Sequence, residues 1–157
     1  MDFDVEVRLL SEQFSNDYPP VAYPELERKA KRPYTCLLID THQDYFICIP
    51  FRSHVSHNNA FHFKNSKRSA RSRSGLDYTK TALISNPDYI DSTPAVIDKD
   101  EYNETMKNIS KIIKDVTAYI DCYIKHQKGI DTLHPKEYAR KYSYSTLPYF
   151  HDILRIE

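Results

Sequence analysis

Side chains suited to phosphate chemistry are gathered at the ends of apolar runs in this chain. Arg52, Ser53, His54 and His57 follow one such run, and Lys80 stands directly before another. Cleavage of RNA by its own 2′-hydroxyl needs one group that takes a proton and one that gives a proton. It also needs donors or cations for the charge that develops on phosphorus. The residue types present meet these needs without a metal ion, so the pattern is compatible with metal-independent RNA cleavage.

Each of these residues also has a plainer interpretation. A serine after a strand closes a turn more often than it acts in catalysis, which applies to Ser53. His57 stands before two asparagines and could be a solvated loop residue. Arg32 could pair with a surface carboxylate. What favours the functional interpretation is that these residues flank the same pair of strand-like segments.

Metal and nucleotide chemistry are disfavoured by what the sequence lacks. His54 and His57 could form two ligands of a metal site, but no third ligand lies in the acid-free stretch around them. With only Gly75 and Gly129 in the chain there is no phosphate-cradling loop, and there is no HExxH or paired CxxC. We therefore expect no metal and no cofactor.

Basic residues are concentrated in one window of a chain whose net charge is zero. The 22 basic and 22 acidic residues cancel. Between Tyr45 and Leu76 there is no Asp or Glu, whereas six cations fall there: Arg52, Lys64, Lys67, Arg68, Arg71 and Arg73. Such a window is typical of a surface that binds a polyanion.

The most basic part of this window carries almost nothing that could anchor it. Residues 65–74 are serine-rich and include one apolar side chain, Ala70. We predict a mobile loop here, within a basic loop at about 52–75, which becomes ordered when a ligand binds. Lys67 and Arg68 would then be phosphate contacts or, more plainly, part of a solvated run.

The apolar pattern predicts an α+β fold. Residues 34–40 and 45–50 form strand-like runs separated by four polar residues, which indicates an antiparallel hairpin covered on both faces. Residues 5–10 and 76–85 also have the composition of strands. A long helix is predicted over about residues 99–128, with Asp98 before its first turn, Glu101 in capping-box register to Asp98, Gly129 at its end and an apolar stripe against the sheet. The length favours a single domain over residues 1–157.

Cysteine usage and the apolar profile bear on the compartment. Three cysteines are an odd number, and Cys36 and Cys48 lie inside apolar runs, where buried reduced thiols are usual. No run approaches the length of a membrane span, and the first residues are acidic where a signal peptide would be basic. We expect a cytoplasmic protein without membrane contact.

Several short segments resemble one family. They are Arg32-Pro33-Tyr34 before an apolar strand, the strand end 49–53, His57-Asn58-Asn59, residues 74–78, and residues 145–151. In these the chain is similar to toxins of the type III toxin–antitoxin endoribonucleases, the superfamily that includes CptN, ToxN, AbiQ and TenpN, with CptN the most similar family.

The resemblance implies a compact, strongly twisted antiparallel sheet surrounded by helices, as in the Kid and MazF toxins. It also implies a sequence-preferring, metal-independent endoribonuclease that leaves 2′,3′-cyclic phosphate ends on cellular or phage mRNA. Such a toxin acts in phage defence and abortive infection. Its partner is its own repeat-derived, pseudoknot-like antitoxin RNA, which binds in the active groove of a closed protein–RNA assembly and inhibits it.

The resemblance also implies roles for particular residues. Ser53 stands at the family's serine, but Arg52 replaces the hydroxyl residue before it and His54 replaces the lysine after it. Our hypothesis is that Ser53 contacts the 2′-hydroxyl or the phosphate, Arg52 and Arg32 stabilise charge, and His54 or His57 moves a proton, with Lys80 a weaker candidate. The expected RNA contacts are Lys31, Tyr34, Asn59, Lys64, Lys67, Arg68, Arg71, Arg73 and Tyr78.

Two other classes of function remain open at this point. The same cations and tyrosines could bind RNA without cleaving it, through phosphate contacts and base stacking. The basic window could instead meet an acidic protein.

Overall fold

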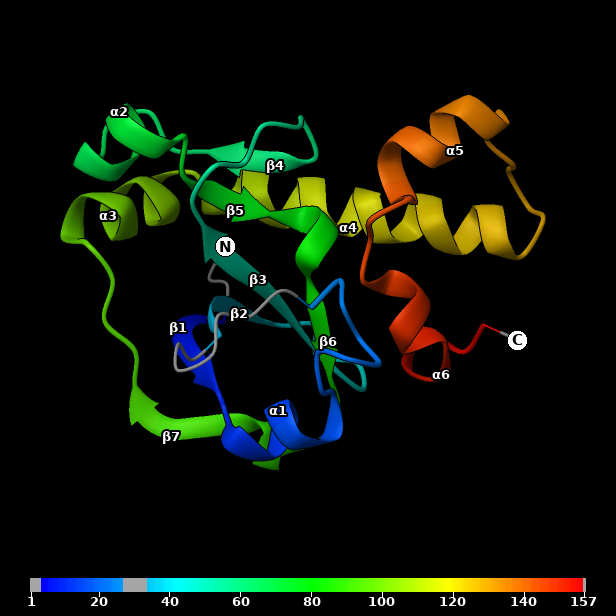
Figure 1. Ribbon diagram of the computed structural model, residues 1–157, viewed down its shortest axis with the longest axis horizontal. Coiled ribbons are helices and arrows are strands. Elements are labelled where there is room, and N and C mark those ends of the chain that lie inside the picture. Colours follow the sequence, from blue (N-terminus) through cyan, green and yellow to red (C-terminus); the bar gives the residue numbers. More distant parts are fainter. Residues whose placement is uncertain (1–3, 27–33, 157) are drawn as a thin grey trace.

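An antiparallel sheet of seven strands forms the centre of the molecule (Figure 1). The computed structural model describes residues 4–26 and 34–156. The strands follow the order β4-β5-β3-β2-β1-β7, and β6 pairs with β3 outside this path. Their bounds are β1 Val5–Leu10, β2 Thr35–Asp40, β3 Phe46–Arg52, β4 Ala60–His62, β5 Gly75–Asp77, β6 Ala82–Ile84 and β7 Ile90–Pro94. With the helices around it, this sheet confirms the predicted α+β class.

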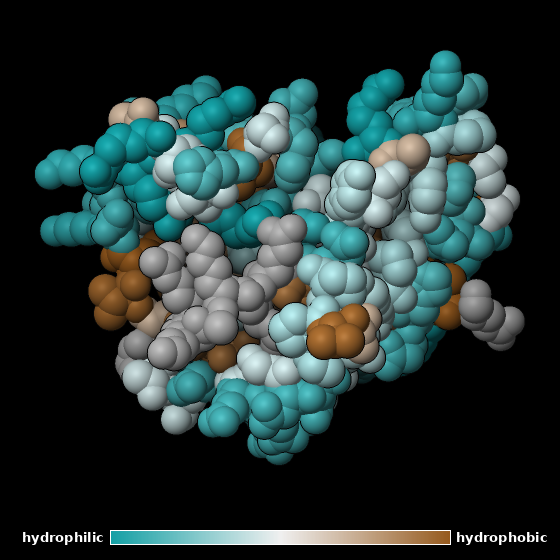
Figure 2. Space-filling model, viewed as in Figure 1, coloured by the Kyte–Doolittle hydropathy of each residue, from teal (hydrophilic) through white to brown (hydrophobic). Residues whose placement is uncertain are grey.

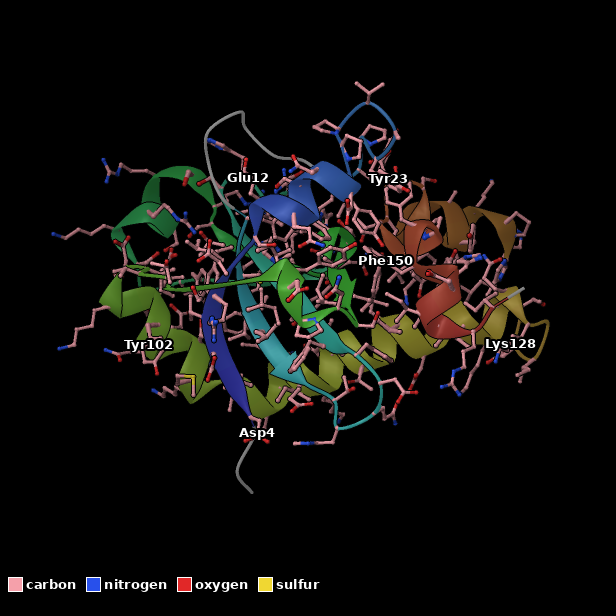
Figure 3. The ribbon with its side chains drawn as sticks, turned by 90° about the horizontal axis from the view of Figure 1, so that it is seen from below. Asp4, Glu12, Tyr23, Tyr102, Lys128 and Phe150 are labelled. Atoms are coloured by element: carbon pink, nitrogen blue, oxygen red, sulfur yellow. The ribbon has the colours of Figure 1, made fainter. Side chains whose placement is uncertain are left out.

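The predicted hairpin is the β2–β3 pair, in which Leu38 faces Cys48 and Ile39 faces Ile47. Four consecutive residues are buried in the middle of each strand. Because successive side chains of a strand point to opposite faces, such a run requires cover on both sides. Figure 3 shows that cover: the long helix α4 (Ile109–Gln127) lies along one face, and α1 (Glu12–Asp17) and Phe150 lie on the other.

One edge of β3 is shared by two short strands. Residues 46–48 of β3 pair with β6, and residues 51–52 pair with β5. Pro50, which has no N–H to donate to a ladder, stands close to the change of partner. Between β5 and β6 the chain leaves the sheet as the 3₁₀ turn η1 (Tyr78–Lys80). The prediction of one strand over residues 76–85 is therefore wrong in its middle part.

The helix predicted over about residues 99–128 exists as two helices. α3 (Lys99–Lys107) and α4 meet at Asn108, whose φ of −111° and ψ of 19° break the helical geometry. Asp98 is at the N-cap position but makes no capping hydrogen bond with its side chain. The predicted capping box is therefore wrong, because the Glu101 carboxylate binds α2 instead. Gly129 follows the end of α4 with a φ of 71°, as predicted for a terminating glycine.

The core face of α4 confirms the predicted apolar stripe. Ile112, Val116 and Ile120 are fully or almost fully buried beneath the sheet. Burial of side chains of this size stabilises a fold by roughly 1.5–3 kcal/mol each. Packing therefore accounts for this face without any role for a cofactor.

The predicted loop over residues 65–74 is a helix in its central part. Helix α2 (Lys67–Ser72) begins after Ser66, whose hydroxyl accepts from the Ser69 N–H, and the Ser69 hydroxyl accepts in turn from the Ser66 N–H. This reciprocal pair is a capping box made by two serines. The loop prediction is wrong because polar caps and carboxylates from α3, rather than apolar anchors, hold this segment.

The remaining described elements complete the cover of the sheet. They are α5 (Pro135–Tyr142), α6 (His151–Leu154), and the 3₁₀ turns η2 (Pro87–Tyr89) and η3 (Leu147–Phe150). None of the described helices has both the length and the apolar character needed to cross a lipid bilayer.

Candidate functional site

The segment that follows β3 is bonded along its length to the segment around β5. The backbone N–H of His54 donates to Ser72 O at 2.5 Å, that of Val55 to Arg73 O at 3.1 Å, and that of Tyr78 to Asn59 O at 3.1 Å. At Gly75 a Cβ would lie only 2.5 Å from the backbone oxygen of Phe61, so a side chain there would push β4 and β5 apart. These contacts fix the residues after β3 close to the end of β5.

Asp77, the last residue of β5, gathers the polar side chains of this region. Its carboxylate accepts from Arg52 Nη1 at 2.8 Å and from Thr79 Oγ1 at 2.6 Å, and lies 3.0 Å from His57 Nε2. It also accepts from the Thr79 N–H at 3.0 Å, while only 1% of its side chain is exposed. We call Arg52, His57, Asp77 and Thr79 the Asp77 cluster.

Opposing influences act on the pKa of Asp77. Burial by itself raises the pKa of this carboxyl, but the hydrogen bonds from His57 and Thr79 and the charge of Arg52 outweigh burial and lower it. Asp77 is therefore held as a carboxylate. An anionic carboxylate between an arginine and a histidine orients both of them.

Both ring nitrogens of His57 are engaged. Nδ1 accepts from the Asn59 N–H at 3.1 Å, and Nε2 faces Asp77 Oδ1. The Asn59 contact requires an unprotonated Nδ1, so the proton of the neutral ring is on Nε2 and is donated to Asp77. His57 is thus placed as part of the cluster, and it can exchange a proton with a substrate only if one of these bonds opens.

Ser53 and His54 differ from His57 in this respect. Within residues 4–26 and 34–156, neither side chain has a hydrogen-bond partner. Ser53 is partly exposed and His54 is exposed. His54 also has a φ of 59°, a conformation that non-glycine residues rarely adopt and that is found repeatedly at functional sites. The two residues that directly follow Arg52 of the Asp77 cluster therefore carry a hydroxyl and an imidazole with no described hydrogen-bond partner.

Lys80 is buried, with only 7% of its side chain exposed. Its Nζ lies 3.0 Å from Glu25 Oε2 and donates to Tyr144 O at 2.7 Å. The Lys80 carbonyl accepts from the Tyr34 hydroxyl. The structure therefore places Lys80 in a buried ion pair that joins three segments, rather than on a surface that a substrate could reach.

Two tyrosines predicted to contact RNA are buried. Tyr34 and Tyr78 are 6% and 4% exposed and belong to the hydrophobic core. Burial raises the pKa of both hydroxyls. A ring inside the core cannot stack on a base, so neither residue is part of the surface that we assign to RNA.

The cations of the basic window divide into two groups. Lys64, Lys67, Arg71 and Arg73 have exposed side chains on and around α2, where Figure 2 shows a hydrophilic surface. Arg68 binds Glu101, with Nη2 2.9 Å from Oε1. The first four remain candidates for phosphate contacts, whereas Arg68 also attaches α2 to α3. Lys31 and Arg32, predicted as an RNA contact and a catalytic cation, lie outside the described residues.

Carboxylates of α3 hold the basic segment in place, and sequence analysis missed them. Glu101 Oε2 accepts from the hydroxyls of Ser66 at 2.8 Å and Ser74 at 2.7 Å. Glu104 accepts from the backbone N–H groups of Lys64 and Asn65. From the sequence, Glu101 was assigned to a capping box with Asp98, and Glu104 was given no role.

Asp77 and Thr79 were also missed. The available signal was that Asp77 is the first acidic residue after the acid-free window and stands near the beginning of the strand-like run 76–85. A lone acid at that position is a candidate partner for the cations before it.

The described residues contain one group with the spacing of metal ligands, formed by Asp4, Asp40 and His42. It lies at the β2–β3 turn, at the opposite end of β3 from Arg52 and so about 20 Å from the Asp77 cluster. His42 already pairs with both carboxylates, at 2.8 Å and 3.6 Å. This group belongs to a different part of the surface.

In comparisons with known proteins, no family model, no curated protein and no solved structure matches the chain. A proposal about function therefore depends on the sequence and on the geometry of the site.

Proposed function

We propose that this protein is a metal-independent endoribonuclease that acts as the toxin of a type III toxin–antitoxin system. The observation that carries the proposal is the juxtaposition of the Asp77 cluster with the uncommitted side chains of Ser53 and His54. Together they supply a guanidinium, a hydroxyl and imidazoles where two strands end, beside the exposed cations of α2. The segments by which the chain resembles these toxins include the same strand end, 49–53.

In the proposed reaction the 2′-oxygen of a ribose attacks the adjacent phosphorus. A new bond forms between the 2′-oxygen and phosphorus, the bond from phosphorus to the 5′-oxygen breaks, and a 2′,3′-cyclic phosphate and a 5′-hydroxyl result. One group takes the proton of the 2′-hydroxyl and another gives a proton to the leaving 5′-oxygen. General acid–base help of this kind contributes typically ~10²- to 10⁴-fold.

The roles follow from what each side chain is free to do. Ser53 contacts the 2′-hydroxyl or a phosphate oxygen, because its own hydroxyl has no described partner. His54 transfers a proton, because its ring is exposed and unengaged. Arg52, oriented by Asp77, stabilises the charge that develops on the phosphoryl oxygens. His57 helps to hold Asp77 and becomes a second proton carrier only when the Asn59 contact opens.

We further propose that the antitoxin RNA occupies the same groove as the substrate. An RNA held at the Asp77 cluster, with its phosphates on Lys64, Lys67, Arg71 and Arg73, would block the site without a separate regulatory pocket. The substrates would be cellular or phage mRNA in the cytoplasm, where the buried thiols of Cys36 and Cys48 stay reduced. Burial raises the pKa of the Cys48 thiol, which disfavours its reactive thiolate form.

One observation favours a second candidate, an RNA-binding module without catalysis. Because both nitrogens of His57 are engaged, this residue is held as a structural part of the site. In that case Ser53 and His54 would be phosphate or base contacts only.

Incubation of the protein with a mixed RNA in EDTA separates the two candidates. We expect wild type and Ser56→Ala to cleave and to leave 2′,3′-cyclic phosphates, whereas Ser53→Ala binds RNA without cleaving it. Ser56 is a matched control because it is an exposed serine of the same segment. Tight binding of intact RNA by wild type would instead establish the binding module, and absence of both activities would refute both candidates.

A further inference from the structure

Tyr144 differs from most tyrosines of this chain. Many of the 13 tyrosines pack in ring clusters, such as those around Phe14 and around Tyr123. The side chain of Tyr144 is 74% exposed, and its ring stacks on no other described ring. A large aromatic side chain left in solvent calls for an explanation when its backbone is held firmly.

The backbone around Tyr144 is held firmly. Its carbonyl accepts from Lys80 Nζ at 2.7 Å, and the next two residues, Ser145 and Thr146, are 3% and 0% exposed. The Thr146 N–H donates to Thr79 O at 2.9 Å, and its hydroxyl donates to Thr81 O. The segment 144–146 is therefore fastened to η1, and Tyr144 projects from a rigid support.

The same contacts bring Tyr144 to the candidate site. Thr79 accepts from Thr146 through its carbonyl and donates to Asp77 through its hydroxyl at 2.6 Å. Lys80, whose ammonium holds the Tyr144 carbonyl, directly follows Thr79. One residue of η1 thus bridges the segment that carries Tyr144 and the Asp77 cluster.

Exposed cations lie on both sides of this region. Lys67 and Arg71 are on α2, and Lys136 and Arg140 are exposed on α5, which ends just before Tyr144. Figure 2 shows a notch between the side that carries α2 and β4 and the side that carries α5, with hydrophilic side chains on both. An exposed aromatic ring in a region with cations on either side is the arrangement that binds unpaired nucleotides, since the cations bind the phosphates and the ring stacks on a base.

We propose that Tyr144 is a stacking platform for one unpaired base of the RNA that enters the Asp77 cluster, so that the site accepts single-stranded RNA and excludes duplex RNA. The bases of a duplex are stacked on each other and cannot lie on a protein ring, whereas bases of single strands and loops can. This inference rests on the proposed function and adds to it the structural class of the substrate.

The absence of tryptophan from the chain gives a direct test. In Tyr144→Trp the only tryptophan reports on contact with a base through quenching of its fluorescence. Tyr102→Trp is the matched control, because Tyr102 is also an exposed tyrosine, 44% exposed, on α3. The probe is a 2′-O-methyl oligoribonucleotide, which cannot be cleaved by 2′-hydroxyl attack, added either as a single strand or annealed to its complement.

We expect the single strand to quench Tyr144→Trp and to leave Tyr102→Trp unchanged. In fluorescence anisotropy, Tyr144→Ala should bind the single strand about 5- to 150-fold more weakly than wild type, the range of base–aromatic stacking. Tyr144→Phe should bind within about twofold of wild type, because stacking needs the ring and not the hydroxyl. Thermal melting of each variant verifies that it is folded.

Two outcomes would overturn the inference in distinguishable ways. If wild type and Tyr144→Ala bind the single strand equally and Tyr144→Trp is not quenched, or if the duplex competes as well as the single strand, the stacking role is wrong while the proposed function stands. If wild type binds neither form of RNA, the proposed function itself fails and the inference fails with it.

Discussion

Asp77 and Glu101 are two buried carboxylates that do different things with similar partners. Their side chains are 1% and 2% exposed, and each binds an arginine, Arg52 at 2.8 Å and Arg68 at 2.9 Å. The other side-chain partners of Glu101 are the hydroxyls of Ser66 and Ser74, whereas Asp77 holds a histidine and the hydroxyl of Thr79. Ser53 and His54, whose side chains have no described partner, directly follow Arg52 of the Asp77 cluster.

The comparison shows how a buried carboxylate that only stabilises the fold differs from one at a candidate functional site. At Glu101 the groups that contact the carboxylate come mainly from α2 and its flanks, so the contacts explain why this segment is ordered. At Asp77 the partners come from the end of β3, the following loop and η1, and two of them are partly exposed. A buried carboxylate that orients a partly exposed imidazole is a candidate for function, and among the described partners of the two carboxylates only Asp77 holds a histidine.

The largest expected effect is on RNA cleavage by Asp77→Asn. Asparagine keeps the shape but loses the charge that orients Arg52 and His57, so the cleavage rate should fall by ~10²-fold or more. Affinity for RNA should stay within a few-fold of wild type. Single-turnover cleavage of a short RNA, with anisotropy for binding, measures both. Glu101→Gln is the matched control and should cleave within a few-fold of wild type; an equal loss in both variants would remove the distinction between the two carboxylates.

The free energy of unfolding should depend on the serine beside Glu101, Ser66, and not on the serine beside the Asp77 cluster, Ser53. Ser66→Ala removes the N-cap of α2 and a hydrogen bond to Glu101, and should lower the free energy of unfolding by ~1 kcal/mol or somewhat more. Ser53→Ala removes a hydroxyl with no described partner and should stay within about 0.5 kcal/mol of wild type. Urea unfolding measures both. A large destabilisation by Ser53→Ala would mean that this hydroxyl has a structural role instead.

The pH dependence of the free energy of unfolding tests whether Asp77 is charged in the folded protein. Because the folded state lowers the pKa of Asp77, its contribution is present above the usual carboxyl pKa of about 3.9 and is lost as the pH falls through the folded value. The difference in unfolding free energy between wild type and Asp77→Asn should be constant at pH 6–7 and should shrink below about pH 4. Asp44→Asn, at a residue 74% exposed, is the control and should show little difference at any pH. A gap that persisted unchanged at low pH would contradict the charged state of Asp77.

The smallest expected effect is at Lys67 on α2. Lys67→Ala should weaken binding to many RNA sequences alike and should lower the slope of log affinity against log salt by about one. Arg68→Ala, next to it, removes the partner of Glu101 and should chiefly lower stability. Titrations at several salt concentrations measure the slope. An unchanged slope for Lys67→Ala would exclude a phosphate contact at this residue.

The sequence predicted those parts of the fold that depend on local patterns. The β2–β3 hairpin, the strand β1, the core face of α4 and the helix stop at Gly129 follow from apolar spacing and glycine geometry. The prediction from sequence failed where the local structure depends on residues far away in the chain. The segment 65–74 is polar and was predicted to be a loop, but hydrogen bonds to Glu101 and Glu104 of α3 order it. A window free of acids along the chain is therefore not free of acids in space.

The candidate site was predicted in part for the same reason. The cluster after β3 could be recognised because its members are neighbours in the sequence. Asp77 and Thr79 join it through the pairing of β5 with β3 and through η1, and the proposed role of Tyr144 depends on the contact of segment 144–146 with η1. No local pattern reveals these contacts. Lys80 was a reasonable candidate by type, but its ion pair with Glu25 is invisible until the fold is known.

The attachment of residues 144–146 to η1 also affects the order in which parts of the protein fold. The strands β1, β2 and β3 are close in sequence and can pair early, but Lys80 and Thr79 receive their partners from segments more than 60 residues away along the chain. Contacts of such long sequence separation form late, because the entropy of closing the intervening loop opposes them. On the ribosome this part of the site therefore stays unfinished until residues 144–146 have emerged, which delays the maturation of the proposed nuclease beyond the folding of most of its sheet.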